Sequence, residues 1–246
     1  MIPKQVHVTW PHKDIIYSNS PLIQNGIANL MLLNPDWTVT VSNDSDVDNY
    51  LRNNLSAADY ELLEPKHIVE KTDVWRLLKI FNEGGLYMDL DRFCNVDLNS
   101  IATSDIKCIL PTAADHDFSQ DFMCSEPGNP IYKETLDLNL QRRREGCNNV
   151  YYLGAQTYMH AITNLLCGHI VNSDPGVNTF AELRDILAQM NFIKTYREQP
   201  PFDTVIYQHD VQKWRGDNPP QQTADWEKLK RNLYQENKLR HWTNTW

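Results

Sequence analysis

Hydrophobic and polar positions change period repeatedly along the chain. Alternation with β-branched and aromatic residues predicts strands in the stretches 2–9, 37–42, 86–90, 106–110, 118–125 and 204–207. Apolar residues at helical spacing predict a helix in the stretch 72–83. Further helices are predicted in the stretches 20–33, 131–144, 154–166 and 180–190, one or two short helices in 48–63, and a polar helix in 224–237. Strands and helices therefore alternate through the first half of the chain, whereas the pattern is looser after residue 91.

Local signals mark where several of these elements begin and end. Ser20-Pro21 is typical of a helix start, and Asn34-Pro35 ends the same helix. Thr72 is the expected N-cap of the next long helix. Gly84-Gly85 stops that helix, because glycine readily adopts the left-handed conformation of a C-terminal cap. The stretch 43–46 is expected to be a turn or strand-end loop that carries acidic groups.

The order of elements predicts an α/β fold with a mainly parallel central sheet and helices on both faces. Neither an internal repeat nor a linker interrupts the sequence, so a single domain over residues 1–246 is expected. In such sheets ligands bind beyond the carboxyl ends of the strands. Trp10 and Asp91 both follow predicted strands, so we expect them to share one crevice.

Composition limits the classes of function. The chain has 32 acidic and 23 basic side chains and a net charge of -9, which argues against general nucleic-acid binding. It has neither an apolar run of about 18 residues nor an N-terminal stretch typical of a signal peptide. A cytoplasmic protein without a membrane span is therefore expected. The basic run Arg142-Arg143-Arg144 is interpreted as a solvated helix terminus.

Cysteine usage adds little chemistry. The five cysteines are an odd number, and no pair has the spacing of a zinc site. Thiols in a reducing compartment are the favoured interpretation, and a disulfide or a catalytic thiol remains an alternative.

The stretch after Gly84-Gly85 carries the most specific chemistry. Tyr87, Asp89 and Asp91 point to one side of the predicted strand, with the two aspartates roughly 7 Å apart along the backbone. Carboxylates are hard oxygen ligands that suit Mg²⁺ or Mn²⁺, and such ions also bind phosphate oxygens. A metal and phosphate site is one interpretation of this triplet, and a surface acidic turn is the other.

Three other side chains have two interpretations each. Asp73 and Arg76 lie on one helix face, where they can form an intrahelical ion pair or bind sugar and phosphate oxygens. Trp10 can stack on a flat ring such as a nucleotide base, or it can pack in the core.

Several motifs in order resemble the DXD-motif sugar-binding glycosyltransferases. This family includes fungal Golgi mannosyltransferases, bacterial capsule transferases and, more distantly, glucosylating domains of clostridial toxins. The clear resemblance covers about residues 1–95 and rests on Ile2-Pro3-Lys4 through Trp10, Asn34-Pro35-Asp36-Trp37, Thr72-Asp73-Val74-Trp75-Arg76 and Gly84-Gly85-Leu86-Tyr87-Met88-Asp89-Leu90-Asp91. Weaker similarity follows at Asp121-Phe122, Gly128-Asn129-Pro130 and the C-terminal His241-Trp242-Thr243-Asn244-Thr245-Trp246. The chain departs from the family at Asp121, where asparagine is common, and at Gly154-Ala155, where Gly-Pro is common.

The resemblance implies a GT-A type, Rossmann-like fold, a divalent metal (Mn²⁺ or Mg²⁺), and retaining transfer from a UDP- or GDP-sugar to a glycan or other hydroxyl acceptor. Residues 1–95 would form the nucleotide-sugar-binding half, and residues 96–246 the acceptor half and a C-terminal lid. The donor-binding residues that it implies are Thr9, Trp10, Thr72, Asp73, Arg76, Tyr87, Asp89, Thr245 and Trp246. The implied metal ligands are Asp89, Asp91 and His241. The implied catalytic residues are Asp73, Arg76, Asp89, Asp91 and Asp121.

Two other classes of function remain open. A nucleotidyltransferase or phosphohydrolase could use the same carboxylates, although the first strand leads into Trp10-Pro11-His12-Lys13 rather than a phosphate-binding glycine loop. A non-catalytic module that binds nucleotide sugars is the second alternative.

Overall fold

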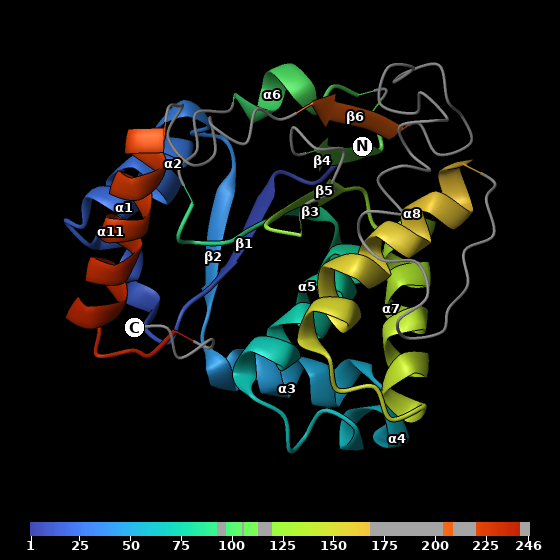
Figure 1. Cartoon of the computed structure of the whole chain (residues 1–246). Coiled ribbons are helices and arrows are strands. Elements are labelled where there is room, and N and C mark those ends of the chain that lie inside the picture. The colour runs from blue at the N-terminus through green and yellow to red at the C-terminus, as the bar shows by residue number, and fades with distance from the viewer. Residues whose placement is uncertain (93–96, 105, 113–119, 168–203, 209–219, 242–246) are drawn as a thin grey trace.

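A six-stranded sheet forms the centre of the molecule (Figure 1). The computed structural model describes residues 1–92, 97–104, 106–112, 120–167, 204–208 and 220–241. The strands are β1 (Gln5–Thr9), β2 (Thr38–Ser42), β3 (Gly85–Met88), β4 (Cys108–Thr112), β5 (Phe122–Ser125) and β6 (Thr204–Gln208). Their order across the sheet is β2-β1-β3-β5-β4-β6.

The sheet is mainly parallel, as predicted, but one strand is reversed. β1 pairs with β2 and β3 in parallel, and β4 pairs with β6 in parallel. β5 runs antiparallel to both of its neighbours, β3 and β4. The strand predicted for 118–125 is observed only over its last four residues, and residues 113–119 lie outside the described part of the chain.

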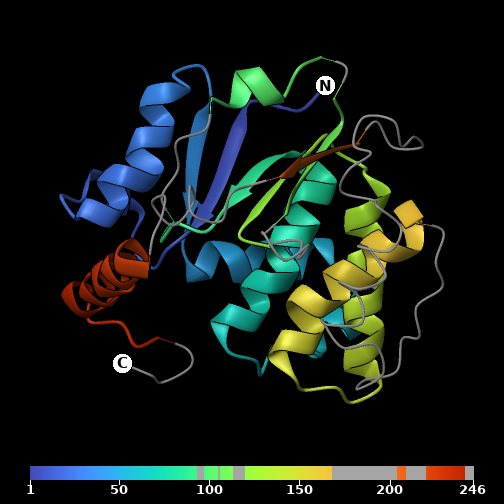
Figure 2. The same cartoon turned by 45° about the horizontal axis from the view of Figure 1, so that its top comes forward.

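Helices cover both faces of the sheet (Figures 1 and 2). One face carries α3 (Asp44–Asn54), α4 (Ala57–Glu61), α5 (Ile68–Glu83), α7 (Pro130–Arg144) and α8 (Thr157–Cys167). The other face carries α1 (Pro21–Ile23), α2 (Asn29–Leu33) and α11 (Pro220–Glu236). Shorter elements are a 3-10 turn (Lys13–Tyr17), the helix α6 (Leu98–Ile101) and two π-helical turns (Gln24–Ala28 and Tyr152–Gln156).

Alternation along the strands divides the core into two clusters. On β3, Leu86 and Met88 pack with the α1, α2 and α11 side, whereas Tyr87 packs with the α5, α7 and α8 side. On β5, Cys124 and Met123 are divided between the two faces in the same way. Because both faces of β3 are buried, the turn that follows this strand begins directly at the core.

Two helices begin earlier than predicted. The expected cap at Thr72 is wrong, because α5 begins at Ile68 and the His67 ring accepts a hydrogen bond from the amide of Val69 at 3.3 Å. Thr72 is instead a buried residue within α5. The turn predicted for 43–46 is a helix start: Asn43 caps α3 and exchanges hydrogen bonds of 3.0 Å with Asp46.

Only Arg144 of the basic end of α7 is exposed as predicted, whereas Arg142 and Arg143 are buried. Arg142 is fully buried, donates to the Thr157 hydroxyl at 2.5 Å and lies 4.1 Å from the centre of the Tyr152 ring. Arg143 is also buried, and its guanidinium lies 2.8 Å from Glu70. The packing of α7 between α5 and α8 buries both side chains, so the sequence interpretation was wrong for these two residues.

Two glycines allow close packing, Gly26 against the turn after β3 and Gly84 directly before β3. Gly26 interrupts the predicted helix 20–33 with φ −102° and ψ −105°, and a Cβ there would lie 2.2 Å from the Arg92 carbonyl oxygen. Gly84 ends α5 with φ +69°, which confirms the predicted helix stop. The carbonyl oxygen of Gly84 also accepts a hydrogen bond of 3.0 Å from Nε2 of the buried His7.

Some predictions concern residues that the structure does not describe. The helix predicted for 180–190, Cys94, and the predicted site residues Thr245 and Trp246 lie outside the described part. Cys108 and Cys124 are buried on β4 and β5, and burial raises the pKa of the Cys124 thiol well above its usual value. Among the described residues, no helix is both long enough and apolar enough to cross a bilayer.

Candidate active site

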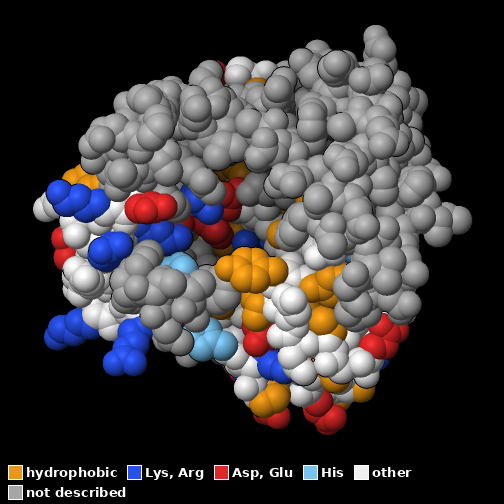
Figure 3. Space-filling model, in the orientation of Figure 1, with side chains coloured by type: hydrophobic (Ala, Val, Ile, Leu, Met, Phe, Trp, Pro, Cys, Tyr) orange, Lys and Arg blue, Asp and Glu red, His pale blue; other side chains and the backbone are white. Residues whose placement is uncertain are grey.

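A cavity of about 440 Å³ opens beyond the carboxyl ends of β1 and β3. Its walls come from the end of β1, from α5 and its cap, from the end of β3 and the turn after it, and from the C-terminal part of the chain. The lining residues are Thr9, Trp10, Pro11, Asp44, His67, Ile68, Val69, Thr72, Arg76, Tyr87, Asp89, Leu90, Asp91, Lys230, Tyr234, Lys238, Leu239, Arg240 and His241. The face in Figure 3 is hollowed near its centre, where acidic and basic side chains gather. Trp10 and Asp91 both line this cavity, which confirms the prediction that they share one crevice.

Arg76 on α5 connects helix and strand at the cavity wall. Its guanidinium lies 2.5 Å from Asp73, 3.4 Å from Asp89 and 3.0 Å from the Gln120 carbonyl oxygen. The predicted intrahelical ion pair with Asp73 is thus present, and both side chains are buried. The guanidinium also lies 4.8 Å from the centre of the Tyr87 ring. These contacts fix the orientation of the Arg76 guanidinium on α5, beside the turn that carries Asp89 and Asp91.

Asp89 lies directly after β3, and its amide donates to the Asp121 carbonyl oxygen at 2.9 Å. This hydrogen bond extends the pairing with the β5 side by one residue and fixes the direction of the side chain. The Tyr87 hydroxyl donates to the Asp89 carboxylate at 2.5 Å. Burial raises the pKa of Asp89; Arg76 lowers it, and the neighbouring carboxylates of Asp91 and Asp121 raise it further.

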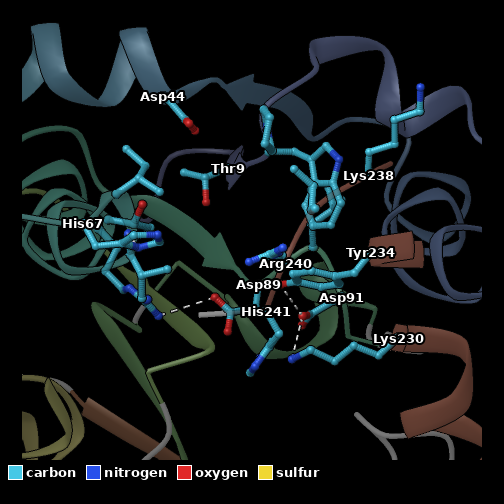
Figure 4. Close-up of a pocket in the computed structure, with 18 of the residues that line it drawn as sticks. Thr9, Asp44, His67, Asp89, Asp91, Lys230, Tyr234, Lys238, Arg240 and His241 are labelled. Carbon is cyan, nitrogen blue, oxygen red and sulfur yellow. Dashed lines mark hydrogen bonds and ion pairs between the residues drawn. The ribbon is translucent and has the colours of Figure 1, made fainter. Parts of the chain in front are cut away.

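Asp91 contacts Lys230 and Tyr234 of α11, near the far end of the chain (Figure 4). The Lys230 ammonium lies 2.7 Å from the Asp91 carboxylate, and the Tyr234 hydroxyl donates to it at 3.4 Å. The Arg92 guanidinium is 4.0 Å away. Burial alone would raise the pKa of Asp91, but Lys230 and Arg92 outweigh burial and lower it below its usual value. Asp91 is therefore an ionised, buried carboxylate at neutral pH.

Residues 20–106 match the family described as "Glycosyltransferase sugar-binding region containing DXD motif". The matched stretch contains Arg76, Asp89 and Asp91, which line the cavity, and Asp73, which is not among the described lining residues but pairs with Arg76. This chain carries a DXD-motif glycosyltransferase region. This match covers less than half of the chain, agrees with the resemblance found in the sequence, and makes the cavity the candidate active site.

One solved structure shows a limited similarity to this chain. The structure titled "PaToxG Glycosyltransferase" is 18% identical in sequence, with a TM-score of 0.49 over 77% of this chain and 75% of that one. A comparison with curated protein sequences gives no significant match.

Asp121 is not in the wall of the cavity that the structure describes. Its carboxylate lies 2.8 Å from Arg92 Nε, and its side chain is 12% exposed. Arg92, to which the sequence assigned no role, therefore lies between Asp121 and Asp91 and links β5 to the turn after β3.

Trp10 combines both interpretations that the sequence left open. It is 7% exposed, packs in the cluster with α1, α2 and α11, and also lines the cavity. Its ring meets the Tyr234 ring edge to face at 5.4 Å. The other predicted donor-binding residues of this wall, Thr9 and Thr72, line the same cavity.

Sequence reasoning missed several cavity residues. Lys230 and Tyr234 come from α11, Lys238 and Arg240 follow it, and His67 caps α5. The helical pattern of 224–237 gave α11, but neither a motif nor a spacing marked Lys230 or Tyr234 as residues of the site. Only the packing of α11 against α1 and Trp10 brings them to Asp91.

The predicted metal ligands Asp89, Asp91 and His241 all line the cavity. Among the described residues, no group of three or more acidic, histidine or cysteine side chains is close enough to hold a metal ion alone. Mg²⁺ and Mn²⁺ sites often use one or two carboxylates, with substrate phosphates and water as the other ligands. The cavity wall offers the two carboxylates of Asp89 and Asp91, so the donor set fits a metal that is shared with a diphosphate.

Proposed function

We propose that the glycosyltransferase moves a hexose from a UDP- or GDP-sugar to a glycan or other hydroxyl acceptor, with a divalent metal and with retention of configuration. The observation that carries this proposal is the convergence of Arg76, Asp89 and Asp91 on one cavity that also contains Trp10. The cavity volume of about 440 Å³ lies within the range of small-molecule sites, roughly 300–1,000 Å³.

Trp10 and Arg76 define two ends of the proposed donor site. In this proposal a nucleotide base stacks on Trp10, as aromatic rings do with bases. The sugar lies at Arg76, and Asp73, which is not among the described residues of the cavity wall, orients the guanidinium from 2.5 Å. Within the described part of the chain, the buried Nε of Arg76 has no hydrogen-bond acceptor, which supports a role as donor to a ligand oxygen.

Asp91 and Asp89, with His241, would hold Mn²⁺ or Mg²⁺ in this proposal. When bound, the metal supplies positive charge that stabilises the diphosphate as a leaving group. The protein contributes a second cation at the same place through Arg76, and the hydrogen bond from Tyr87 keeps the Asp89 carboxylate in position.

Leaving-group stabilisation is favoured over a covalent step through Asp121. The carboxylate of Asp121 is occupied by Arg92 at 2.8 Å and is not among the described residues of the cavity wall. The acceptor hydroxyl would attack from the face on which the diphosphate leaves, which gives retention. The division into a donor half (1–95) and an acceptor half with a lid (96–246, including Thr245 and Trp246) is part of the same proposal.

The proposal is tested by release of nucleoside diphosphate from UDP- and GDP-sugars, with Mn²⁺ or with a chelator. We expect release by the wild type only with metal, and a loss of at least about 100-fold in Asp91→Ala, because metal stabilisation of the leaving group contributes several kcal/mol. Asp137→Ala, on the exposed surface of α7, is the matched control. A rate that is independent of metal and unchanged in Asp91→Ala would contradict the proposal.

The same assay separates the two alternatives. Consumption of nucleoside triphosphate in preference to nucleotide sugar would favour a nucleotidyltransferase or phosphohydrolase. Binding of nucleotide sugar without turnover over a broad set of acceptors would favour a non-catalytic module.

A further inference from the structure

Lys230 makes a close ion pair with the aspartate that is proposed to bind the metal. Its ammonium lies 2.7 Å from the Asp91 carboxylate, and the two side chains are 14% and 8% exposed. Exposed ion pairs have little effect, whereas a pair shielded from water holds both groups in place. Figure 4 shows the Lys230 chain reaching across from α11, with its ammonium directed at Asp91.

An ammonium at this position conflicts with a divalent ion. A metal held by Asp91 would contact a carboxylate oxygen directly, and the Lys230 ammonium lies 2.7 Å from the same carboxylate. Two cations at such short separation repel each other strongly where water is excluded. Binding of the metal therefore requires Lys230 to move away from Asp91.

Once Lys230 moves away from Asp91, the proposed diphosphate of the donor is a second anionic partner within its reach. It lines the cavity in which the donor diphosphate is proposed to lie, and its flexible four-carbon chain can turn without movement of the helix. The Tyr234 ring centre, 5.9 Å from the ammonium, offers an intermediate position on the same helix.

We propose that Lys230 is an exchangeable counter-ion of Asp91. It neutralises this carboxylate until the divalent metal binds, and it then pairs with the diphosphate of the donor. Lys230 thus opposes metal binding in the absence of nucleotide and supports nucleotide binding in the presence of metal. This inference rests on the proposed function, because it needs both the metal and the diphosphate.

A purely structural ion pair makes a different prediction. If Lys230 only fastened α11 to the turn after β3, its loss would weaken both ligands or neither. An exchangeable counter-ion predicts effects of opposite sign on the two ligands, which a loosened helix does not produce.

The test measures Mn²⁺ binding through the electron paramagnetic resonance signal of the free ion, first without nucleotide. Lys230→Met is expected to bind Mn²⁺ about 10- to 100-fold more tightly than the wild type, the range for a hydrogen bond to a charged group. With saturating Mn²⁺, the same variant is expected to bind UDP or GDP at least about 10-fold more weakly in calorimetry.

Two further variants control for charge and for folding. Lys238→Met removes the same charge from an exposed residue of the same cavity, and it is expected to change Mn²⁺ affinity no more than about fivefold. Lys230→Arg keeps a cation at the position and is expected to stay closer to the wild type than Lys230→Met for both ligands.

The outcomes distinguish the inference from the proposed function. Unchanged or weaker Mn²⁺ binding by Lys230→Met, with normal binding by the wild type, would overturn the counter-ion role alone. An equal gain in Lys238→Met would overturn it too, since the effect would then be one of general charge. A wild type that binds no Mn²⁺, with or without UDP and GDP, would contradict the metal site and this inference together.

Discussion

Replacement of Arg76 by methionine tests whether the cavity wall depends on one buried cation. The change keeps much of the side-chain volume but removes the contacts to Asp73 at 2.5 Å, to Asp89 at 3.4 Å and to the Gln120 carbonyl at 3.0 Å. The side chains of Arg76 and Asp73 are 10% and 11% exposed, so water cannot easily replace the lost partner. Asp73 would then be a buried carboxylate without compensation from Arg76.

The expected cost to the free energy of unfolding is about 3–5 kcal/mol, the range for removal of one partner from a buried ion pair. For a protein of this size, about 2–4 °C of melting temperature accompanies each kcal/mol, so the decrease is roughly 6–20 °C. Arg76→Met with Asp73→Asn is expected to recover about 1–3 kcal/mol, because the uncompensated carboxylate is then neutral. Asp89 would still lack its contact with Arg76, so recovery remains partial.

Urea unfolding followed by tryptophan fluorescence measures all three proteins, and Lys133→Met on the exposed surface of α7 serves as the control. An Arg76→Met protein within about 1 kcal/mol of the wild type would refute the reasoning. A double variant that is less stable than Arg76→Met would also refute it, because the penalty would then not come from the charge on Asp73.

Two further predictions concern Trp10 and His7. Trp10→Leu is expected to weaken nucleotide binding in calorimetry by about 1–3 kcal/mol through loss of base stacking. Trp37→Leu, from the same cluster with 6% exposure, should lose stability but keep affinity; wild-type affinity in Trp10→Leu would contradict the stacking role. Burial lowers the pKa of His7, so as the pH falls the unfolded state takes up a proton before the folded state does. The stability that the neutral His7 ring contributes is therefore complete above about pH 6.5 and is lost as the pH falls below this value. The melting temperature should therefore fall less steeply between pH 7 and 5 in His7→Gln than in the wild type; this variant keeps a donor for the Gly84 carbonyl oxygen. An equal dependence of melting temperature on pH in the two proteins would contradict this assignment.

Much of the fold follows from local sequence signals. The positions of β1, β2 and β3 and the stop at Gly84 follow from periodicity and from glycine. The reversal of β5 does not, because Phe122–Ser125 alternates in the same way whichever direction the strand runs. The early start of α5 was missed because Thr72 is a good capping residue, whereas His67 caps less often.

The site divides in the same way between local and distant residues. Asp73, Arg76, Asp89 and Asp91 lie on α5, β3 and the turn that follows, which are consecutive in the chain. Their spacing in the sequence is therefore enough to predict that they are neighbours in the fold. Lys230 reaches Asp91 only through the packing of α11 on the other face of the sheet, and a lysine on a polar helix looks like a surface residue. The burial of Arg142 and Arg143 was missed for the same reason, since it depends on the helices packed around α7.

Thermal unfolding with a panel of nucleotide sugars, each with and without Mn²⁺, tests the proposed function most directly. A ligand that binds only the folded protein raises the melting temperature. We expect one UDP- or GDP-sugar to give a rise that needs Mn²⁺ in the wild type and is absent in Asp91→Asn. A rise of the same size without metal and in Asp91→Asn, or a larger rise with nucleoside triphosphates than with any nucleotide sugar, would contradict a metal-dependent sugar-donor site.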